Sequence, residues 1–335
     1  MRAWLIRGGV GLLTVGVLLA AWAGWWVYRD LPLRTSPVEL AIEPGTSVRQ
    51  IAEQVQVAGV EVSPSLLYWM IRLSGQARQI KAGNYEVSPG VSAWQLLQKL
   101  ARGEESLQAV ALIEGWTWRQ WRSSLDKAEF LRHDTRDLSD ADIARRLGLT
   151  PDALEGRFYP DTYTYAKGSS DLNVLERAQR AMDRQLNVQW KQRASDLSIT
   201  QIEQARILAS LIEKETGRAS DRAMISSVFH NRLRLGMPLQ TDPTVIYGMG
   251  PSFDGNLRRR DLRSDHAWNT YTRNGLPPTP IAMPGKGALM AAVQPARSQA
   301  LYFVARGDGS SEFSDNLEQH NRAVDRYQRS RRQAQ

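Results

Sequence analysis

The sequence predicts an α+β protein with a single N-terminal transmembrane helix, a small α/β module and a larger mixed α+β domain. Residues 8–28 form one uninterrupted apolar run, and short alternating strand patterns lie between amphipathic helix patterns in the rest of the chain. The chain shows no internal repeat and no low-complexity linker. We place the cytoplasmic stub and anchor at residues 1–29, the module at 30–107 and the larger domain at 108–335.

The apolar run Gly8–Tyr28 has 21 residues without a charge, enough in helical form to cover the roughly 30 Å hydrocarbon core of a bilayer. Arg2 and Arg7 precede it, and three tryptophans gather near its far end, where amphipathic rings favour the headgroup region. The positive-inside rule then leaves the N-terminus in the cytoplasm and the remaining chain outside. A cleavable signal peptide is the alternative, although its apolar region normally runs about 7–15 residues.

The module at 30–107 alternates strand and helix patterns. Val38–Glu43 alternates apolar and polar residues as a half-buried strand does, and Pro44-Gly45 turns the chain into a helix that opens at Thr46 or Ser47. The remaining expected elements are a helix after Ser63-Pro64, a strand at 83–87 and an amphipathic helix through 94–100.

The larger domain starts less regularly, and its clearest signals follow Thr200. The capping-box spacing of Thr200 and Glu203 predicts a helix that runs to Thr216. Asp221 opens a second helix, and Asp242 before Pro243 is typical of an N-cap with proline at the first helical position. The other expected elements are a strand at 109–113, helices near 118–125 and 139–146, a turn-rich segment at 155–163 and a hairpin from 301–305 to 312–313.

Composition excludes several kinds of chemistry. The chain has no cysteine, so thiol nucleophiles, disulfides and thiolate metal sites are absent, and its four histidines, at 133, 230, 266 and 320, are scattered. No phosphate loop, dinucleotide fingerprint or zinc-protease motif occurs, and we predict neither metal nor cofactor. Forty-three Lys and Arg against 35 Asp and Glu give a net charge of +8. The basic residues form no stripe with interleaved aromatics, so we expect no nucleic-acid partner.

A glutamate lies on the apolar face of the helix predicted at 200–216. At 100° per residue, Glu215 falls between the directions of Leu208 and Leu211, whereas Glu213 points about 200° away, on an edge where solvated residues are usual. Burial would raise the pKa of Glu215, as a general acid at neutral pH requires. The alternative is that the last helical turn frays and leaves Glu215 exposed.

Two loops rich in amides, hydroxyls and tyrosines follow this helix. They span 239–248 and 268–281 and are stiffened by proline. Amide and hydroxyl groups hydrogen-bond sugar hydroxyls, and aromatic faces cover the apolar side of a pyranose ring. Either loop alone is an ordinary connector, but together, and near an oddly placed glutamate, they favour a sugar-binding cleft.

Several segments together closely resemble the MltG/YceG-like family of endolytic murein transglycosylases. They are Leu208–Thr216 with its Glu-Lys-Glu-Thr, Val228–Leu233, Leu239–Gly248, Asn269-Thr270-Tyr271 followed by Gly275–Pro278, and Glu155-Gly156 with Pro160–Tyr163. The resemblance covers about Val38 to Tyr327 and includes the anchor. It implies cleavage of peptidoglycan glycan between N-acetylmuramic acid and N-acetylglucosamine with a 1,6-anhydro end, and a LysM-like fold for the glycan-binding module at 30–107.

The resemblance makes residues 108–335 the catalytic domain and assigns the catalytic glutamate to Glu215, the residue that the helix face also selects. It implies peptidoglycan glycan strands as substrate, the inner membrane as location, with the catalytic domain in the periplasm, and wall-synthesis enzymes as candidate partners. The substrate-binding residues that we expect around Glu215 are Asn231, Gln240, Thr241, Asp242, Tyr247, Asn269 and Tyr271.

Two alternatives to this function stay open. A glycoside hydrolase would use Glu215 with Asp242 or another distant acid to activate water, because such enzymes need two carboxylates. A lytic transglycosylase needs one, since the C6 hydroxyl of the muramic residue is an internal nucleophile. A wall-binding scaffold without activity would use the module at 30–107 for affinity and the second domain only to recruit synthases.

Overall fold

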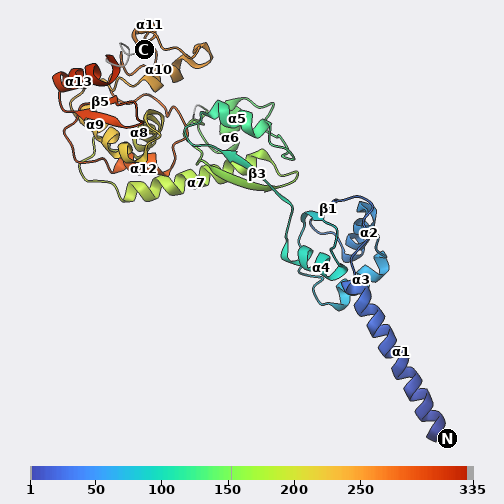
Figure 1. Cartoon of the computed structure of the whole chain (residues 1–335). Coiled ribbons are helices and arrows are strands. Elements are labelled where there is room, and N and C mark those ends of the chain that lie inside the picture. The colour runs from blue at the N-terminus through green and yellow to red at the C-terminus, as the bar shows by residue number, and fades with distance from the viewer. Residues whose placement is uncertain (1, 152, 330–335) are drawn as a thin grey trace. The chain divides into compact units, whose positions relative to one another are not determined.

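The computed structural model describes residues 2–151 and 153–329, with side chains from 13 to 151 and from 153 to 327. The chain divides into two compact units; Figure 1 shows most of the first in blue to cyan and the second in green to red. Unit 1 comprises Met1–Gln108 with Thr164–Gly168, and unit 2 comprises Ala109–Tyr163 with Ser169–Gln335.

Unit 1 is built around a two-stranded antiparallel sheet with helices packed on it. Its elements are α1 (Arg2–Tyr28), β1 (Val38–Ile42), α2 (Val48–Ala58), α3 (Pro64–Leu73), β2 (Gly83–Val87) and α4 (Ala93–Arg102). Val38 pairs with Val87 and Ile42 with Gly83. Every second residue of β1 is buried, which confirms the alternation expected there. Ser47 opens α2 with a capping box, so the turn and helix start also agree with the expectation.

The last turn of α1 belongs to the core of unit 1. Trp26 is only 7% exposed and packs in the same cluster as Leu31 and the helices of the module, and the Tyr28 ring lies 6.5 Å from that of Trp94. Residues 8–12 of the expected span lie outside the part of the chain whose side chains are described. Within the described part, no helix is both long and apolar enough to cross a membrane.

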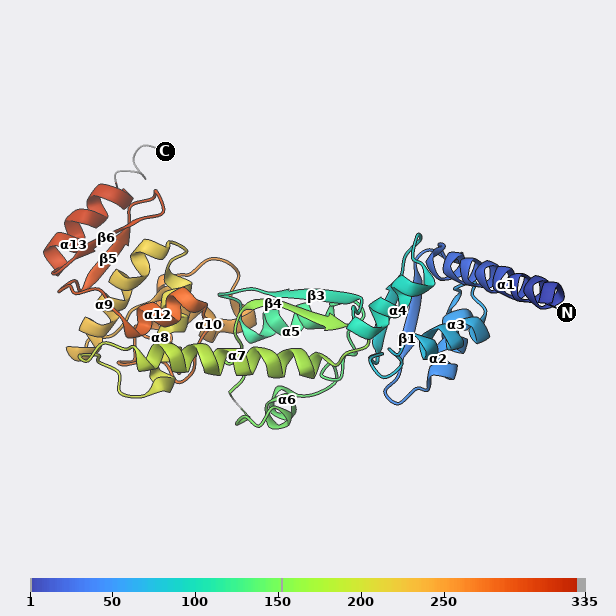
Figure 2. The same ribbon diagram turned by 90° about the horizontal axis from the view of Figure 1, so that it is seen from below.

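Unit 2 packs helices around α8 and carries two small sheets. Its elements are β3 (Leu107–Leu112), whose first two residues lie in unit 1, α5 (Trp118–Asp126), α6 (Asp140–Arg146), β4 (Asp161–Ala166), whose last three residues lie in unit 1, α7 (Asp171–Lys191), α8 (Ile202–Glu215), α9 (Arg222–Arg234), α10 (Asp242–Met249), α11 (Arg259–Arg263), α12 (Lys286–Val293), β5 (Tyr302–Ala305), β6 (Ser311–Ser314) and α13 (Leu317–Val324). The helices α7, α9 and α12 each contact α8, and α12 also contacts α7 and α9. Figure 2 shows α7 running from this cluster along the β3–β4 sheet, while β5, β6 and α13 gather at the far end of the unit.

Several elements differ from the expectation. The helix expected from Thr200 begins at Ile202, because Gln204 rather than Glu203 accepts the hydrogen bonds of the Thr200 and Gln201 amides. The N-cap of α10 is Thr241, one residue before the expected Asp242. Five elements were not predicted from the sequence: β4, α7, α11, α12 and α13. The turn residues at 155–163 obscured the start of β4. In α12 five of the eight residues are buried, three of them in succession at 291–293, which weakens the helical periodicity.

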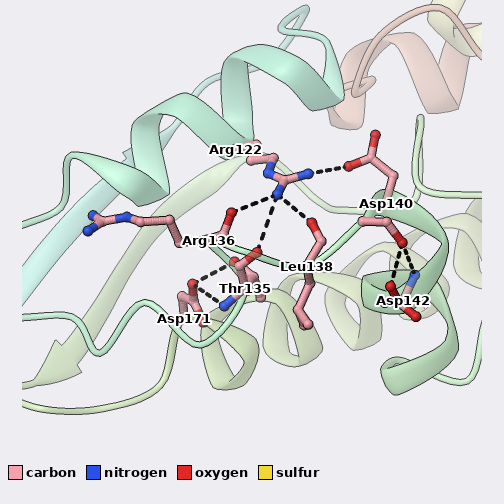
Figure 3. A network of polar contacts seen from close by, with 8 residues as sticks. Arg122, Thr135, Arg136, Leu138, Asp140, Asp142 and Asp171 are labelled. Carbon is pink, nitrogen blue, oxygen red and sulfur yellow. Dashed lines mark hydrogen bonds and ion pairs between the residues drawn. The ribbon is translucent and has the colours of Figure 1, made fainter.

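A polar network fixes the irregular loop between α5 and α6 (Figure 3). The guanidinium of Arg122 donates to the backbone carbonyls of residues 135, 136 and 138 and to the Asp140 carboxylate, at 2.6 to 3.3 Å. The fully buried Asp171, at the start of α7, accepts hydrogen bonds from the amide and hydroxyl of Thr135. These bonds replace regular secondary structure as the support of this loop.

Candidate active site

Glu215 is the last residue of α8. The face predicted to be apolar is buried, since Leu208, Leu211 and Ile212 are all fully covered. Glu215 itself is half-buried and accepts a hydrogen bond from the Thr241 hydroxyl. Burial raises the pKa of Glu215 to about 7; the Thr241 hydrogen bond opposes this shift and the nearby Asp242 carboxylate adds to it. A substantial fraction of this carboxyl therefore carries a proton at neutral pH.

The two residues before Glu215 fix the last turn of the helix. The expectation that Glu213 lies on a solvated edge is wrong: its side chain is 5% exposed and accepts from the Gly285 amide at 2.8 Å and from Arg222 at 3.4 Å. Lys214 donates to the Gly115 carbonyl at 3.2 Å. These contacts hold the helix end, so Glu215 has a defined position and the last turn is not frayed.

A cavity of about 550 Å³ opens beside Glu215. Gln240, Asp242 and Tyr271, all expected to bind substrate, line it together with Glu215. The Tyr271 hydroxyl donates to the Asp242 carboxylate at 2.6 Å. The other lining residues are Arg232 and Leu239, four residues of β5 (302–305), Ser311, and Leu317, His320 and Val324 on or at the end of α13. The volume falls within the range of about 300–1,000 Å³ typical of small-ligand sites.

The irregular segment before α10 places Thr241 against Glu215. Gln240 has φ +51°, which is in the left-handed region. For a residue other than glycine this conformation costs about 1 kcal/mol. Its amide donates to the Thr270 carbonyl at 3.0 Å, and the Thr241 amide donates to the Thr270 hydroxyl at 3.1 Å. This strained turn directs the Thr241 hydroxyl at Glu215 and is held in place by the second loop.

Three residues expected to contact substrate lie elsewhere. Asn269 is fully buried, and its amide group donates to the carbonyls of Leu262 and Ser264 and accepts from the Tyr271 amide, so it shapes the loop and does not line the cavity. Asn231 points to the carbonyls of residues 298 and 300 and lines a different cavity, of about 360 Å³. Tyr247 does not line the Glu215 cavity either and donates to Glu155.

Glu155 is a further buried carboxyl, for which no role was predicted from the sequence. It accepts from the Trp118 amide at the start of α5, at 3.0 and 3.1 Å, and from the Tyr247 hydroxyl at 3.1 Å. Burial raises the pKa of Glu155 to about 7 against these hydrogen bonds. The following Gly156 has φ +73°, and a Cβ there would lie 2.5 Å from Pro280. Glu155 therefore ties α5 to α10 in the interior of unit 2.

Glu155→Gln is expected to flatten the pH dependence of stability. A carboxyl with a pKa near 4.5 unfolded and about 7 folded stabilises the fold fully below pH 4.5, and this contribution is lost as the pH rises to about 7. Glutamine does not ionise and keeps an acceptor for the Trp118 amide. We expect similar unfolding free energies at pH 5 and a more stable variant at pH 8, by up to about 3 kcal/mol. Urea titrations at both pH values measure this difference.

Glu318→Gln is the matched control, because the Glu318 side chain is 80% exposed. It should leave the pH dependence as in the parent chain. Equal slopes in the Glu155 variant and the parent would show that Glu155 is not a buried protonated carboxyl.

His230, one of the four scattered histidines, lies in the core of unit 2. His230 is buried in α9, with Nδ1 beside the Ser198 hydroxyl at 2.8 Å and Nε2 beside the Ala292 carbonyl at 2.9 Å, and its burial lowers the pKa of the imidazole. It is a satisfied core residue. Across the residues that the structure describes, no three His, Cys, Asp or Glu side chains group as ligands for a metal ion.

One protonatable carboxyl in a polar, aromatic-lined cavity defines a site of the general acid–base type. The chain belongs to the YceG-like family, whose model matches residues 40–326. It is 31% identical to an endolytic murein transglycosylase of Bacillus subtilis (strain 168), over 87% of this chain and 84% of that protein. A protein of the same name from Streptococcus pneumoniae (strain ATCC BAA-255 / R6) is 27% identical over 86% of this chain, which spans 58% of that longer protein.

The fold is also similar to a solved structure. The crystal structure of a yceG-like protein from Listeria monocytogenes matches with a TM-score of 0.51 and 29% sequence identity. The match covers 86% of this chain and 98% of that chain.

Proposed function

We propose that this chain is an endolytic lytic transglycosylase that cleaves the peptidoglycan glycan strand, with Glu215 as its single acid and base. The observation that carries the proposal is a half-buried carboxyl with a pKa of about 7, which accepts from Thr241 and lines a polar cavity. The names of the Bacillus and Streptococcus relatives support the substrate.

The reaction needs no second carboxylate. Protonated Glu215 gives its proton to the glycosidic oxygen between muramic acid C1 and the N-acetylglucosamine, and the C1–O bond breaks. The muramic C6 oxygen bonds to C1, and the Glu215 carboxylate takes the proton of that hydroxyl. The products are a 1,6-anhydromuramic end and a free hydroxyl on the glucosamine, and no water is consumed.

Mass spectrometry of the fragments released from purified sacculi tests this chemistry. The full chain in detergent should release fragments ending in anhydromuramic acid. Asp242 shares the cavity with Glu215 and so favours, as a second candidate, a hydrolase that activates water. A hydrolase would release reducing ends heavier by one water, and a scaffold without activity would release nothing.

Asp242→Asn is expected to shift the pH–rate profile to lower pH. The Asp242 carboxylate helps to raise the pKa of Glu215, so removing its charge lowers that pKa. The acid form of Glu215 is then lost earlier on the alkaline side, and the falling limb of the cleavage rate, expected near pH 7 in the parent, moves down. Cleavage rates of soluble glycan strands from pH 5 to 9 measure this limb. If the falling limb does not move, the charge of Asp242 does not affect the pKa of Glu215.

We also propose that unit 1 is a LysM-like module that binds glycan and that α1 anchors the chain in the inner membrane, with the N-terminus in the cytoplasm and unit 2 in the periplasm. The strand–helix–helix–strand order of β1, α2, α3 and β2 supports the first proposal, and the uncharged run 8–28 supports the second. Retention of the chain in membranes after alkaline extraction, and digestion of unit 2 by protease added to spheroplasts, test the anchor and its orientation. Wall-synthesis enzymes are the partners that we propose for a chain at this location.

A further inference from the structure

The wall of the Glu215 cavity formed by β5 and α13 contains an aromatic stack. The ring of His320, from α13, lies 5.2 Å from that of Tyr302, from β5, with an interplanar angle of 25°. The Arg232 guanidinium lies over the Tyr302 ring at 5.0 Å. All three residues line the cavity, which joins α9, β5 and α13 around the carboxyl of Glu215.

Arg232 is held rigidly at one end of this stack. Its Nε donates to the Leu301 carbonyl at 2.7 Å and its Nη1 to the Leu239 carbonyl at 2.9 Å, and the residue is buried. The Tyr302 ring therefore packs against a cation of fixed position, and the electron-rich face of the ring attracts that cation. Because Arg232 fixes the Tyr302 ring, the His320 ring that stacks on Tyr302 has a defined orientation at the cavity.

His320 has an unused hydrogen-bonding capacity. Within the described part of the chain the His320 side chain makes no hydrogen bond. Its Nδ1 is covered by protein, so Nε2 is the nitrogen available to a ligand in the cavity. Burial, with a smaller contribution from the Arg232 charge, lowers the pKa of His320, so the imidazole is neutral and offers one donor and one acceptor.

We propose that Tyr302 and His320 form a saccharide subsite, in which the imidazole hydrogen-bonds a hydroxyl or acetamido group of a sugar ring next to the bond that is cleaved. This rests on the proposed function and adds to it a substrate-contact residue. The cavity carries two carboxylates and one cation besides its aromatic and aliphatic wall, so it suits a neutral polyhydroxylated ligand better than a phosphorylated one.

The test compares glycan affinity in chains that cannot cleave. In the full chain with Glu215→Gln, the additional change His320→Phe keeps a ring on Tyr302 and removes both nitrogens. Loss of one neutral hydrogen bond should weaken binding of soluble, peptide-free glycan strands by about 3- to 10-fold. His320→Gln, which keeps a donor and an acceptor, should bind more tightly than His320→Phe. Asn321→Ala, at the next and exposed position of α13, is the matched control and should bind as the parent does.

In the cleavage-competent chain, His320→Phe should raise KM by a similar factor and leave kcat within about twofold, because the contact is made before and during the reaction alike. Unchanged affinity and KM in both His320 variants, or an equal loss in Asn321→Ala, would overturn the subsite. Cleavage that persists in Glu215→Gln alone would instead overturn the catalytic assignment and leave the affinity result standing.

Discussion

Glu215→Gln is expected to lower the rate of glycan cleavage by at least about 10²–10⁴-fold while the chain keeps its fold. Glutamine has the same shape and still accepts from the Thr241 hydroxyl, but it cannot donate the proton that the leaving oxygen needs. The change also removes the desolvation penalty of a buried carboxyl, so the unfolding temperature should not fall. Release of anhydro fragments from sacculi, measured beside thermal unfolding, separates the two effects.

Glu213→Gln is the matched control two residues away on the same helix. Its amide oxygen can still accept from the Gly285 amide, and only the charge beside Arg222 is lost. We expect cleavage within several-fold of the parent rate. If this variant were inactive and Glu215→Gln retained most of the activity, the roles of the two glutamates would be exchanged.

Removal of residues 1–29 is expected to destabilise unit 1, although removal of residues 1–21 is not. The shorter deletion ends before Trp26, whereas the longer one removes a tryptophan that is 7% exposed in the core. Loss of a large buried aromatic side chain costs about 3–5 kcal/mol. A domain boundary placed after residue 29 therefore cuts off Trp26, which belongs to the core of the module.

Urea unfolding of the two truncated chains, followed by circular dichroism, measures the difference. Trp26→Ala in the chain that starts at residue 22 should reproduce most of the loss, and Trp25→Ala, at an adjacent position that is 58% exposed, should cost little beyond its contact with Arg29. Equal stability of the two truncated chains would show that the last turn of α1 is dispensable to unit 1.

Local sequence patterns predicted the elements whose periodicity is clear. The strands of unit 1 and the face of α8 follow from alternation and from 3.6-residue spacing, and the same spacing placed Glu215 on the buried side. The prediction for Glu213 was wrong because its partners, Gly285 and Arg222, belong to other segments of the chain. Helical periodicity describes one helix and contains no information on what packs against its other edge.

The polar loops show a second limit. The sequence does not distinguish an asparagine that binds a ligand from one that donates to backbone carbonyls. Asn269 and Asn231 both donate to backbone carbonyls. In the sequence His320 is only one of four scattered histidines. Its contact with Tyr302 is visible only in the folded chain. Gln240, Asp242 and Tyr271 do line the cavity of Glu215, as expected of the two loops, although their binding of substrate stays a prediction.

The last turn of α8 depends on parts of the chain that are made at very different times. Glu213 is bonded to residue 285, Lys214 to residue 115 and Glu215 to residue 241. A chain that emerges from its N-terminus forms the helix well before residues 241 and 285 are available to meet it. Until then Glu215 is an ordinary solvated carboxyl, ionised at neutral pH and unable to donate a proton. An unfinished chain would therefore lack the protonated carboxyl on which the proposed cleavage depends.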